Sequence, residues 1–304
     1  MQGDDAAPPA ERTEVRTAEF TSVRPLLFSM AYRMLGSVSD AEDVVQDAYT
    51  RWVNANEADV RAPRAYLATI VTRLSINHLR SARQRREEYV GTWLPEPLMT
   101  EHAPDPSEAV ELAESLSMAF LLMLERLSPI ERAVLLLHDV FDFEYAEIAR
   151  IIEKSEANCR QLLSRAKKHV GEAETRFEAD PADAARLLER FADAAYAGDI
   201  DGLLAVLAED ITIYTDGGGK SRAARRPIVG ANSVARFIVG VLQRFVPAER
   251  TLRPARINGQ PGFVVHAGGR LIAALVFDIR DDRIRAIYSV SNPDKIGRLA
   301  GRGA

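Results

Sequence analysis

The 304-residue chain contains a single cysteine, Cys159, and this scarcity excludes several classes of protein. One thiol cannot form a disulfide within the chain, nor can it build a cysteine-rich zinc site. The sequence therefore predicts a cytoplasmic protein without crosslinks or a structural metal. We also expect no cofactor. The glycines of residues 216–220 lack the spacing of a phosphate-binding loop.

Long apolar runs are missing as well. The longest runs, such as residues 271–277, are far shorter than the roughly 20 residues that a membrane-spanning helix needs. Residues 1–17 are polar and contain four prolines or aspartates near their start, which is not the layout of a signal peptide. We interpret them as a loose tail and expect no membrane partner.

Charge is plentiful but unevenly distributed. The net charge of −5 would by itself argue against a nucleic-acid partner. Residues 37–50, however, contain four carboxylates and no Lys or Arg, whereas residues 61–86 contain seven arginines and no Asp or Glu. Such segregation predicts two surfaces with different partners.

Apolar residues recur at helical spacing through residues 20–89. The first helix is expected to cover residues 20–35. Ser39 and Glu42 match a capping box that would begin a second, acidic helix. A polar loop then leads to a basic helix over residues 64–86. We expect this helix to pack through Leu67, Ile70, Val71, Leu74 and His78.

Four prolines in residues 91–109 predict an acidic linker between two helical regions. Residues 93–97 are apolar for a free linker. This segment is therefore a candidate for docking on another part of the protein.

Residues 144–152 and 156–170 are predicted to be two short helices joined by a tight turn, preceded by a helix with a capping box at Ser128 and Glu131. The last helix is basic, which is typical of a helix-turn-helix. If Ser155 caps it, its first turns can enter a major groove. In the groove, base edges or phosphates would be contacted by Asn158, Arg160, Gln161, Ser164, Arg165, Lys167 and Lys168. The alternative to DNA binding is a helical hairpin with a solvated basic face.

The pattern changes from helical to mixed beyond residue 180. Helices are expected over residues 182–197, 200–208 and 233–245, and strands over residues 211–215, 252–257, 263–267, 271–279 and 284–290. Two-residue turns at 258–259, 268–269 and 281–282 join the last four strands. Helices followed by an antiparallel meander indicate an α+β domain.

An enzyme site in this domain was considered and is not expected. Most candidates lie near turns, where a solvated carboxylate is the commoner explanation, and His266 fits a strand residue with a satisfied hydrogen bond. No acid–base pair stands out at a definite spacing. We therefore predict no catalytic residue among Tyr214, Asp216, His266, Asp278 and Asp294.

The order of acidic helix, polar loop, basic helix, linker and helix-turn-helix resembles the extracytoplasmic-function (group IV) sigma factors of the sigma-70 family. DAEDVVQDA at residues 40–48 resembles their core-polymerase-binding region 2.2. AYLATI and NHLR, at residues 65–70 and 77–80, resemble regions 2.3 and 2.4, which melt and read the −10 element. LSPIER, at residues 127–132, and RQLLSRA, at residues 160–166, resemble region 4, which reads the −35 element. Two departures are Glu144, where a Ser or Thr helix cap is usual, and Leu162, where an Arg is common.

The resemblance implies specific contacts. The partner would be core RNA polymerase, through its β′ clamp and β flap, and the core-binding residues would be Asp40, Asp43, Gln46, Asp47 and Arg51. Contacts with the −10 DNA would involve Asn54, Asn56, Arg61, Arg64, Tyr66, Arg73, Asn77, Arg80 and Arg83. Ser155 and Glu156 would join the seven residues named above at the −35 DNA.

Residues 181–300 resemble a SnoaL-like domain, and WLPEP, DGGGK and NPDK resemble signatures of the sigma subgroup with this extension. In that subgroup the extension is thought to control the sigma factor in place of a separate anti-sigma protein. Its pocket could hold an unknown small ligand. Regulatory contacts within the chain are expected at Trp93, Leu94, Pro95, Asp216, Gly217, Gly218, Gly219, Lys220, Asn292, Pro293, Asp294 and Lys295.

The sequence thus predicts a multidomain fold, with two all-α sigma domains and a C-terminal α+β SnoaL-like cone. The expected divisions are region 2 over 18–90, a linker over 91–115, region 4 over 116–173 and the SnoaL-like domain over 180–300. The expected function is promoter-specific transcription initiation, modulated by the C-terminal domain. Two alternatives stay open: an operator-binding regulator, which leaves the acidic and Arg-rich helices unused, and a SnoaL-type isomerase or cyclase fused to DNA-binding helices.

Overall fold

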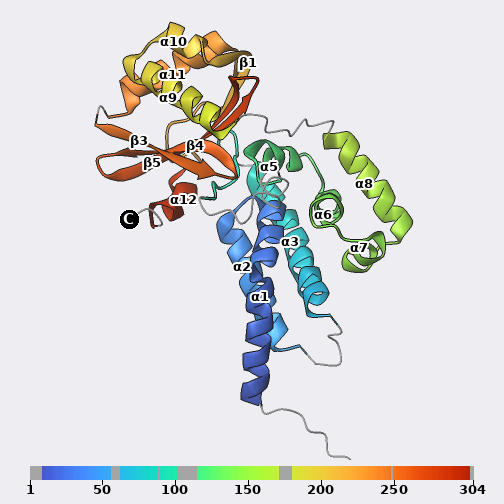
Figure 1. Cartoon of the computed structure of the whole chain (residues 1–304). Coiled ribbons are helices and arrows are strands. Elements are labelled where there is room, and N and C mark those ends of the chain that lie inside the picture. Colours follow the sequence, from blue (N-terminus) through green and yellow to red (C-terminus); the bar gives the residue numbers. More distant parts are fainter. Residues whose placement is uncertain are drawn as a thin grey trace, which may run out of the picture. The chain divides into compact units, whose positions relative to one another are not determined.

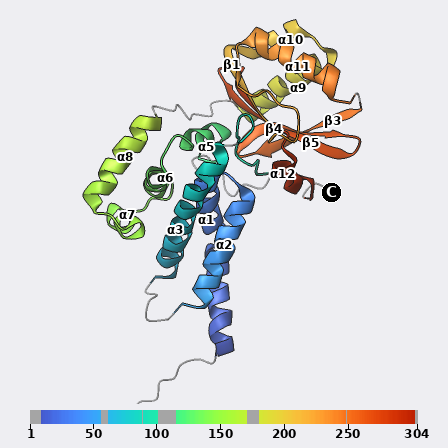
Figure 2. The same ribbon diagram turned by 180° about the vertical axis from the view of Figure 1, so that it is seen from behind.

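The computed structural model describes residues 9–55, 62–87, 89–100, 115–170, 180–247 and 249–301. The contacts divide the chain into two compact units (Figures 1 and 2). The first contains residues 1–83 and 126–171, and the second contains residues 84–125 and 172–304. In the described parts, no helix is long and apolar enough to cross a membrane.

Three helices form the N-terminal part of the first unit: α1 (Pro9–Leu35), α2 (Val38–Val53) and α3 (Pro63–Glu87). The prediction of a loose tail over residues 1–17 is wrong from Pro9 onward. Arg16 is the physical reason, because its Nη1 donates to the carbonyls of Trp52, Val53 and Ala55. In return, the indole Nε1 of Trp52 donates to the carbonyl of Arg16. These bonds hold the early turns of α1 against the end of α2.

The start of α2 also differs from the prediction. Ser37, rather than Ser39, is the N-cap, and its hydroxyl accepts a hydrogen bond from the backbone N–H of Asp40 at 3.2 Å. The expected capping box of Ser39 and Glu42 is therefore wrong by two residues, because both lie inside the helix. The apolar face of α2 is as predicted, with Ala41, Val45, Ala48 and Trp52 buried.

In α3 the packed face is only partly the predicted one. Leu67 and Val71 are buried, but Ile70, Leu74 and His78 are half-buried. The buried face turns instead through Thr72 and Ser75, together with Ala68, Ile76 and Leu79. The prediction relied on the spacing of apolar residues. It therefore missed the small polar residues of the buried face and placed that face too far towards Ile70 and Leu74.

The remaining helices of the first unit confirm the helix-turn-helix. They are α6 (Pro129–Leu135), extended by a π-helical turn (Leu136–Val140), α7 (Tyr145–Ile152) and α8 (Glu156–Val170). The capping box of Ser128 and Glu131 is present at the start of α6. Glu153 ends α7 in the left-handed conformation, with φ 55°. Cys159, Leu163 and Ala166 are buried on the inward face of α8, and burial raises the pKa of the Cys159 thiol.

The second unit contains a six-stranded sheet of order β2-β1-β6-β5-β4-β3 together with helices, which is the α+β architecture predicted for it. The strands are β1 (Leu207–Asp216), β2 (Ile228–Val229), β3 (Arg250–Ile257), β4 (Gln260–Ala267), β5 (Arg270–Arg280) and β6 (Arg283–Val290). The helices are α5 (Met118–Leu124), α9 (Pro181–Ala197), α10 (Ile200–Leu204), α11 (Ala231–Phe245) and α12 (Pro293–Ile296), followed by a 3-10 turn (Gly297–Gly301).

The meander of β3 to β6 is confirmed, with positive φ at both residues of the turns at 258–259, 268–269 and 281–282. Two features near β1 differ from the prediction or lie beyond it. The helix expected over residues 200–208 ends at Leu204, because β1 begins at Leu207 and its first strand residues are already buried. In addition, β1 pairs in parallel with β6, a long-range pairing that no local pattern reveals.

Each face of the sheet has its own apolar layer. Helices α9, α10 and α11 cover one face (Figure 1), where Phe191, Val234 and Phe277 are among the buried residues. The opposite face packs against the linker residue Leu94, the α5 residue Met118 and the α12 residue Ile296. The apolar linker segment over residues 93–97 therefore docks on the sheet of the second unit.

Candidate functional sites

The acidic helix α2 presents most of its predicted contact residues to solvent. Asp43, Gln46, Asp47 and Arg51 are exposed. Asp40 is half-buried, and its Oδ2 lies 3.3 Å from Nε2 of His78 on α3. Two carboxylates, Asp43 and Asp47, are thus placed one helical turn apart on an exposed face, where they can meet a basic partner.

The basic helix α3 places Arg64, Asn77 and Arg80 in solvent. Tyr66 is half-buried, with its ring 6.0 Å from that of Trp52. The amide of Asn54 donates to the carbonyl of Thr50, so this residue closes the last turn of α2. Asn56, Arg61 and the side chain of Arg83 lie outside the described residues.

Arg73 does not extend freely from α3. Its Nε donates to the carbonyl of Ile151 at 2.8 Å, and its Nη2 donates to the carbonyl of Arg150 at 3.1 Å. The same Nη2 lies 3.0 Å from Oε1 of Glu153. A cation at the C-terminal end of a helix satisfies its last carbonyls and suits its dipole. Arg73 therefore caps α7, a contact that the sequence did not predict.

Two buried arginines join the same parts of the first unit. Nη1 of Arg132, on α6, donates to the carbonyl of Met34 at 2.7 Å. Arg33, on α1, is buried and lies over the ring of Phe141 at 5.6 Å, and burial lowers its pKa to about 10. The helix-turn-helix is thus packed against the N-terminal helices.

The start of α8 has the geometry expected of a recognition helix. Ser155 accepts a hydrogen bond from the backbone N–H of Asn158 at 3.3 Å, which confirms the predicted cap. Arg160 pairs with Glu156 at 3.0 Å and lies over the ring of Tyr145 at 4.7 Å. Lys167 pairs with Asp139 at 3.0 Å. The remaining predicted residues on α8 that are exposed are Gln161, Ser164, Arg165 and Lys168.

The missing Ser or Thr cap of α7 is replaced locally. Oε2 of Glu147 accepts a hydrogen bond from the backbone N–H of Glu144 at 3.1 Å. A carboxylate near a helix N-terminus is favoured by the dipole. Glu144 is therefore compatible with a stable start of α7.

Asp216 is the centre of a buried network in the second unit. Its side chain is fully buried. Oδ1 accepts hydrogen bonds from the Tyr89 hydroxyl at 2.5 Å and the Gly218 N–H at 3.0 Å. Oδ2 accepts from the Leu94 N–H at 2.9 Å and from Nζ of Lys295 at 2.7 Å. The interpretation of this residue as a solvated turn carboxylate is wrong.

The residues around Asp216 complete the network. Nζ of Lys295 also donates to the carbonyl of Leu94 and lies 4.3 Å from the Trp93 ring centre. The amide of Asn292 donates to the hydroxyl of Tyr89 at 2.9 Å. Pro95 is buried, and Pro293 is exposed at the first position of α12. Two further predicted residues, Lys220 and Asp294, pair with each other at 2.5 Å in an exposed position.

The glycines of DGGGK have distinct roles. Gly218 and Gly219 have φ of 59° and 71°, the left-handed conformation that glycine adopts at no steric cost. A Cβ at Gly218 would lie 2.3 Å from the amide nitrogen of Asn292, and one at Gly217 would lie 2.4 Å from the carbonyl of Ser221. A side chain at Gly218 would therefore push apart two segments that the network joins, and one at Gly217 would disrupt the turn itself.

Sequence reasoning missed Tyr89. Burial, followed by its hydrogen bond to Asp216, raises the pKa of the Tyr89 phenol well above its ordinary value. The phenol therefore stays protonated and remains a donor at neutral pH. An isolated tyrosine four residues before the WLPEP segment gave no signal of this role.

The other candidate residues for an enzyme site make contacts of their own. Tyr214 stacks on Tyr288, and Asp278 is buried and pairs with Arg280 at 3.3 Å, so it is not a solvated carboxylate. Nδ1 of His266 is buried and has no hydrogen-bond partner among the described residues, which contradicts the satisfied hydrogen bond expected for it.

Two family models match the chain. Sigma-70 region 2 matches residues 20–86, and sigma-70 region 4 matches residues 117–170. The first includes the acidic and basic helices, and the second includes the helix-turn-helix together with α5.

Similar proteins extend the match to nearly the whole chain. The ECF RNA polymerase sigma factor SigJ of Mycobacterium tuberculosis H37Rv is 40% identical over 291 residues, which are 92% of this chain and 93% of SigJ. The probable ECF sigma factor SigI of strain CDC 1551 is 30% identical over 93% of this chain and 95% of its own length. The crystal structure of M. tuberculosis SigJ superposes with a TM-score of 0.73 at 38% identity, covering 92% of this chain and 98% of that one.

Helices of the sigma-70 type and an α+β domain in one chain define a transcription initiation factor with a C-terminal extension. The chain belongs to the extracytoplasmic-function RNA polymerase sigma factors.

Proposed function

We propose that this sigma factor directs core RNA polymerase to its promoters in the cytoplasm, and that its own C-terminal domain governs that activity. Regulation by the C-terminal domain is supported by the buried Asp216. Its carboxylate accepts hydrogen bonds from the segment after region 2 and so joins that segment to the C-terminal domain. No catalytic role and no cofactor enter this proposal.

The core-binding surface is proposed to be the exposed face of α2. Asp43 and Asp47 lie there without an ion pair among the described residues, and they suit basic residues of the β′ clamp. Region 4 would meet the β flap. Changing both Asp43 and Asp47 to Lys should weaken holoenzyme assembly, measured by co-migration with core polymerase. Glu19→Lys, at an exposed position of α1, is the matched control.

The DNA-binding surfaces are proposed on α3 and α8. Exposed Arg64, Asn77 and Arg80 suit the backbone of an opened strand at the −10 element. The capped N-terminal turns of α8 suit the major groove of the −35 element. Arg73 would reach DNA only after it leaves the end of α7.

The C-terminal domain is proposed to act by holding the linker. Tethered surfaces meet at an effective concentration on the order of millimolar for a short linker, so a modest network can stay closed. Because the linker connects regions 2 and 4, its docking governs how these regions can be arranged on a promoter. Docking restrains the free protein and assists it once polymerase is bound.

Run-off transcription with core RNA polymerase tests the proposal. The wild-type protein should give promoter-specific transcripts, whereas an operator-binding regulator or an enzyme fused to DNA-binding helices would give none. Asp216→Asn, which weakens the pairing with Lys295, should change output at equal holoenzyme levels. Asp183→Ala is the control, because it removes an exposed pair on α9 outside the buried network. Equal output from wild type and Asp216→Asn would contradict regulation by the domain.

A further inference from the structure

The hairpin turn between β3 and β4 holds a second part of the chain, which lies within region 4. Asn258 is fully buried and has a φ of 54°. Its Nδ2 donates to the carbonyl of Leu116 at 3.1 Å, and its Oδ1 accepts from the N–H of Leu98 at 2.9 Å. One side chain therefore binds both the linker and the residues that precede α5.

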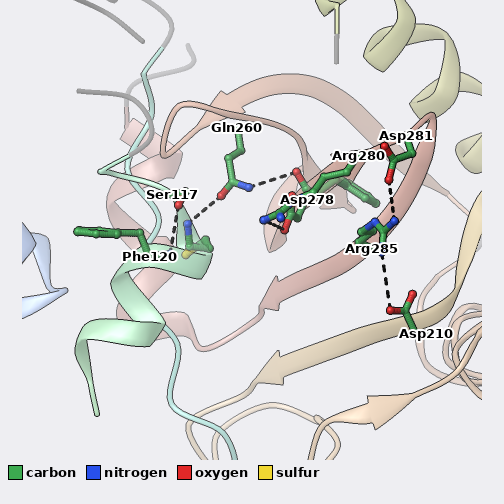
Figure 3. Close-up of polar contacts among 10 residues, drawn as sticks. Ser117, Phe120, Asp210, Gln260, Asp278, Arg280, Asp281 and Arg285 are labelled. Carbon is green, nitrogen blue, oxygen red and sulfur yellow. Dashed lines mark hydrogen bonds and ion pairs between the residues drawn. The ribbon is translucent and has the colours of Figure 1, made fainter. Parts of the chain in front are cut away.

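Gln260 extends this attachment to α5 itself. It is fully buried, and its Oε1 accepts a hydrogen bond from the N–H of Met118, the first residue of α5, at 2.8 Å. Its Nε2 donates to the carbonyl of Phe277 on β5. Figure 3 shows Gln260 between the sheet and the first turn of α5, which begins after Ser117. The first free N–H group of the helix is thus satisfied by the sheet.

Apolar packing adds to these polar contacts. Met118, Ala119 and Leu122 of α5 pack against the sheet face that contains Ile257 of β3 and Val276 of β5. Met118 is fully buried. The first helix of region 4 therefore belongs structurally to the C-terminal domain, although the family model assigns it to region 4.

The segment between α5 and the helices that follow it is short. Residues 125–128 separate Leu124, the end of α5, from Pro129, the start of α6. Fully extended, the steps between those two residues span at most about 18 Å. A second connection, residues 171–180, joins α8 to α9. While α5 stays on the sheet, the reach of the helix-turn-helix is limited at its N-terminal end.

We propose that Asn258 and Gln260 are positioning residues that fix where region 4 begins, and thereby set the separation of −10 and −35 elements that the factor accepts. The inference rests on the proposed sigma function and adds a second holding point, distinct from Asp216. Loss of either residue should change how strongly transcription depends on spacer length. The bases that the factor reads and its binding to core polymerase should not change.

Two variants test this positioning role. Asn258→Asp keeps a residue that tolerates positive φ and keeps an oxygen for Leu98 N–H. It replaces the donor to Leu116 with an acceptor, so it releases the region 4 side alone. Gln260→Met is close in size and removes the bond to Met118. Asp282→Asn is the matched control, because Asp282 has a φ of 54° in the β5–β6 turn of the same sheet and is exposed.

The measurement is run-off transcription from promoters whose spacer changes in single base pairs, at matched holoenzyme levels. Wild type and Asp282→Asn should show one preferred spacer. Asn258→Asp and Gln260→Met should show a several-fold smaller difference between the preferred spacer and its neighbours, with unchanged −10 and −35 base preferences. Thermal melting identifies a variant that fails to fold, in which case the other variant decides.

An unchanged spacer profile, or an equal loss of output at every spacer length, in a folded variant would overturn the positioning role. Failure of wild type to transcribe from any promoter would instead contradict the proposed sigma function itself. The two failures are therefore distinguishable in one set of reactions.

Discussion

Arg73 of α3 and Glu153 of the helix-turn-helix form an ion pair of 3.0 Å, and the same guanidinium donates to the last carbonyls of α7. Arg73 is also one of the residues expected to follow the −10 DNA strand. The contact therefore occupies a proposed DNA-binding group within the protein, so the packed first unit and bound DNA would compete for the Arg73 side chain.

Removal of Glu153 should shift this competition towards DNA. Both side chains are largely exposed, so the ion pair stabilises the packed arrangement by only about 0.2–1 kcal/mol. Glu153→Ala should then tighten binding of a −10 DNA strand by about five-fold or less, measured by fluorescence anisotropy. Asp183→Ala, which removes an exposed pair on α9, is the control. Weaker binding by Glu153→Ala than by the control would show that the pair does not compete with DNA.

The capping box at the start of α6 should make stability depend on pH. Burial by itself raises the pKa of Glu131, but hydrogen bonds from Ser128 and the nearby His169 and Arg165 outweigh it and lower the pKa below 4.5. A carboxylate with a lowered folded-state pKa stabilises the protein above its unfolded pKa, and this contribution disappears as pH falls through the folded value.

Glu131→Gln keeps an oxygen that can accept from Ser128 but loses the charge, so it should lose about 0.3–1 kcal/mol of stability at neutral pH, the usual range for a carboxylate at a helix N-terminus. The difference from wild type should shrink as the solution is acidified below about pH 4.5. Urea unfolding at a series of pH values measures both effects. A constant difference across the series would mean that the ionised carboxylate is not the stabilising group.

How much could be predicted from the sequence depends on whether the signal is local. The helix-turn-helix, the Ser128 and Ser155 caps and the three two-residue turns follow from patterns within a few residues, and the structure has them. The parallel pairing of β1 with β6 joins segments some 75 residues apart in the chain, and no nearby residue marks it.

The sites show the same division. WLPEP, DGGGK and NPDK were singled out, and the structure brings them together at Asp216. Asn258 and Gln260 were not, because a buried polar side chain beside a turn has the same local pattern as an ordinary turn. Arg73 was assigned to DNA for its place on a basic face, and its cap of α7 depends on tertiary packing.

Arg160 should read a base of the −35 element. Its pair with Glu156 and its position over the Tyr145 ring hold the guanidinium at the start of α8. Arg160→Ala should cost about 1–3 kcal/mol in binding and relax one base preference, because a bidentate contact would be lost. Lys168→Ala should weaken all sequences alike and flatten the salt dependence. Binding to a panel of single-base −35 variants separates these outcomes, and an unchanged preference in Arg160→Ala would place the reading residue elsewhere on α8.

The docking of the linker can be followed directly at the backbone of Leu94. Its N–H donates to buried Asp216, and its carbonyl accepts from Lys295, so this amide should exchange slowly with solvent in the wild-type protein. Tyr89→Phe removes a donor from Asp216 and leaves the amide of Asn292 without its partner in the buried network. Because a buried polar group left unpaired costs about 1–3 kcal/mol, exchange over residues 93–97 should accelerate by about ten-fold or more. Asn258→Asp, which acts on the other holding point, should leave exchange at residues 93–97 close to wild type. Equal acceleration of this segment by both variants would mean that the linker and α5 leave the sheet as one cooperative unit, and that the two holding points do not act separately.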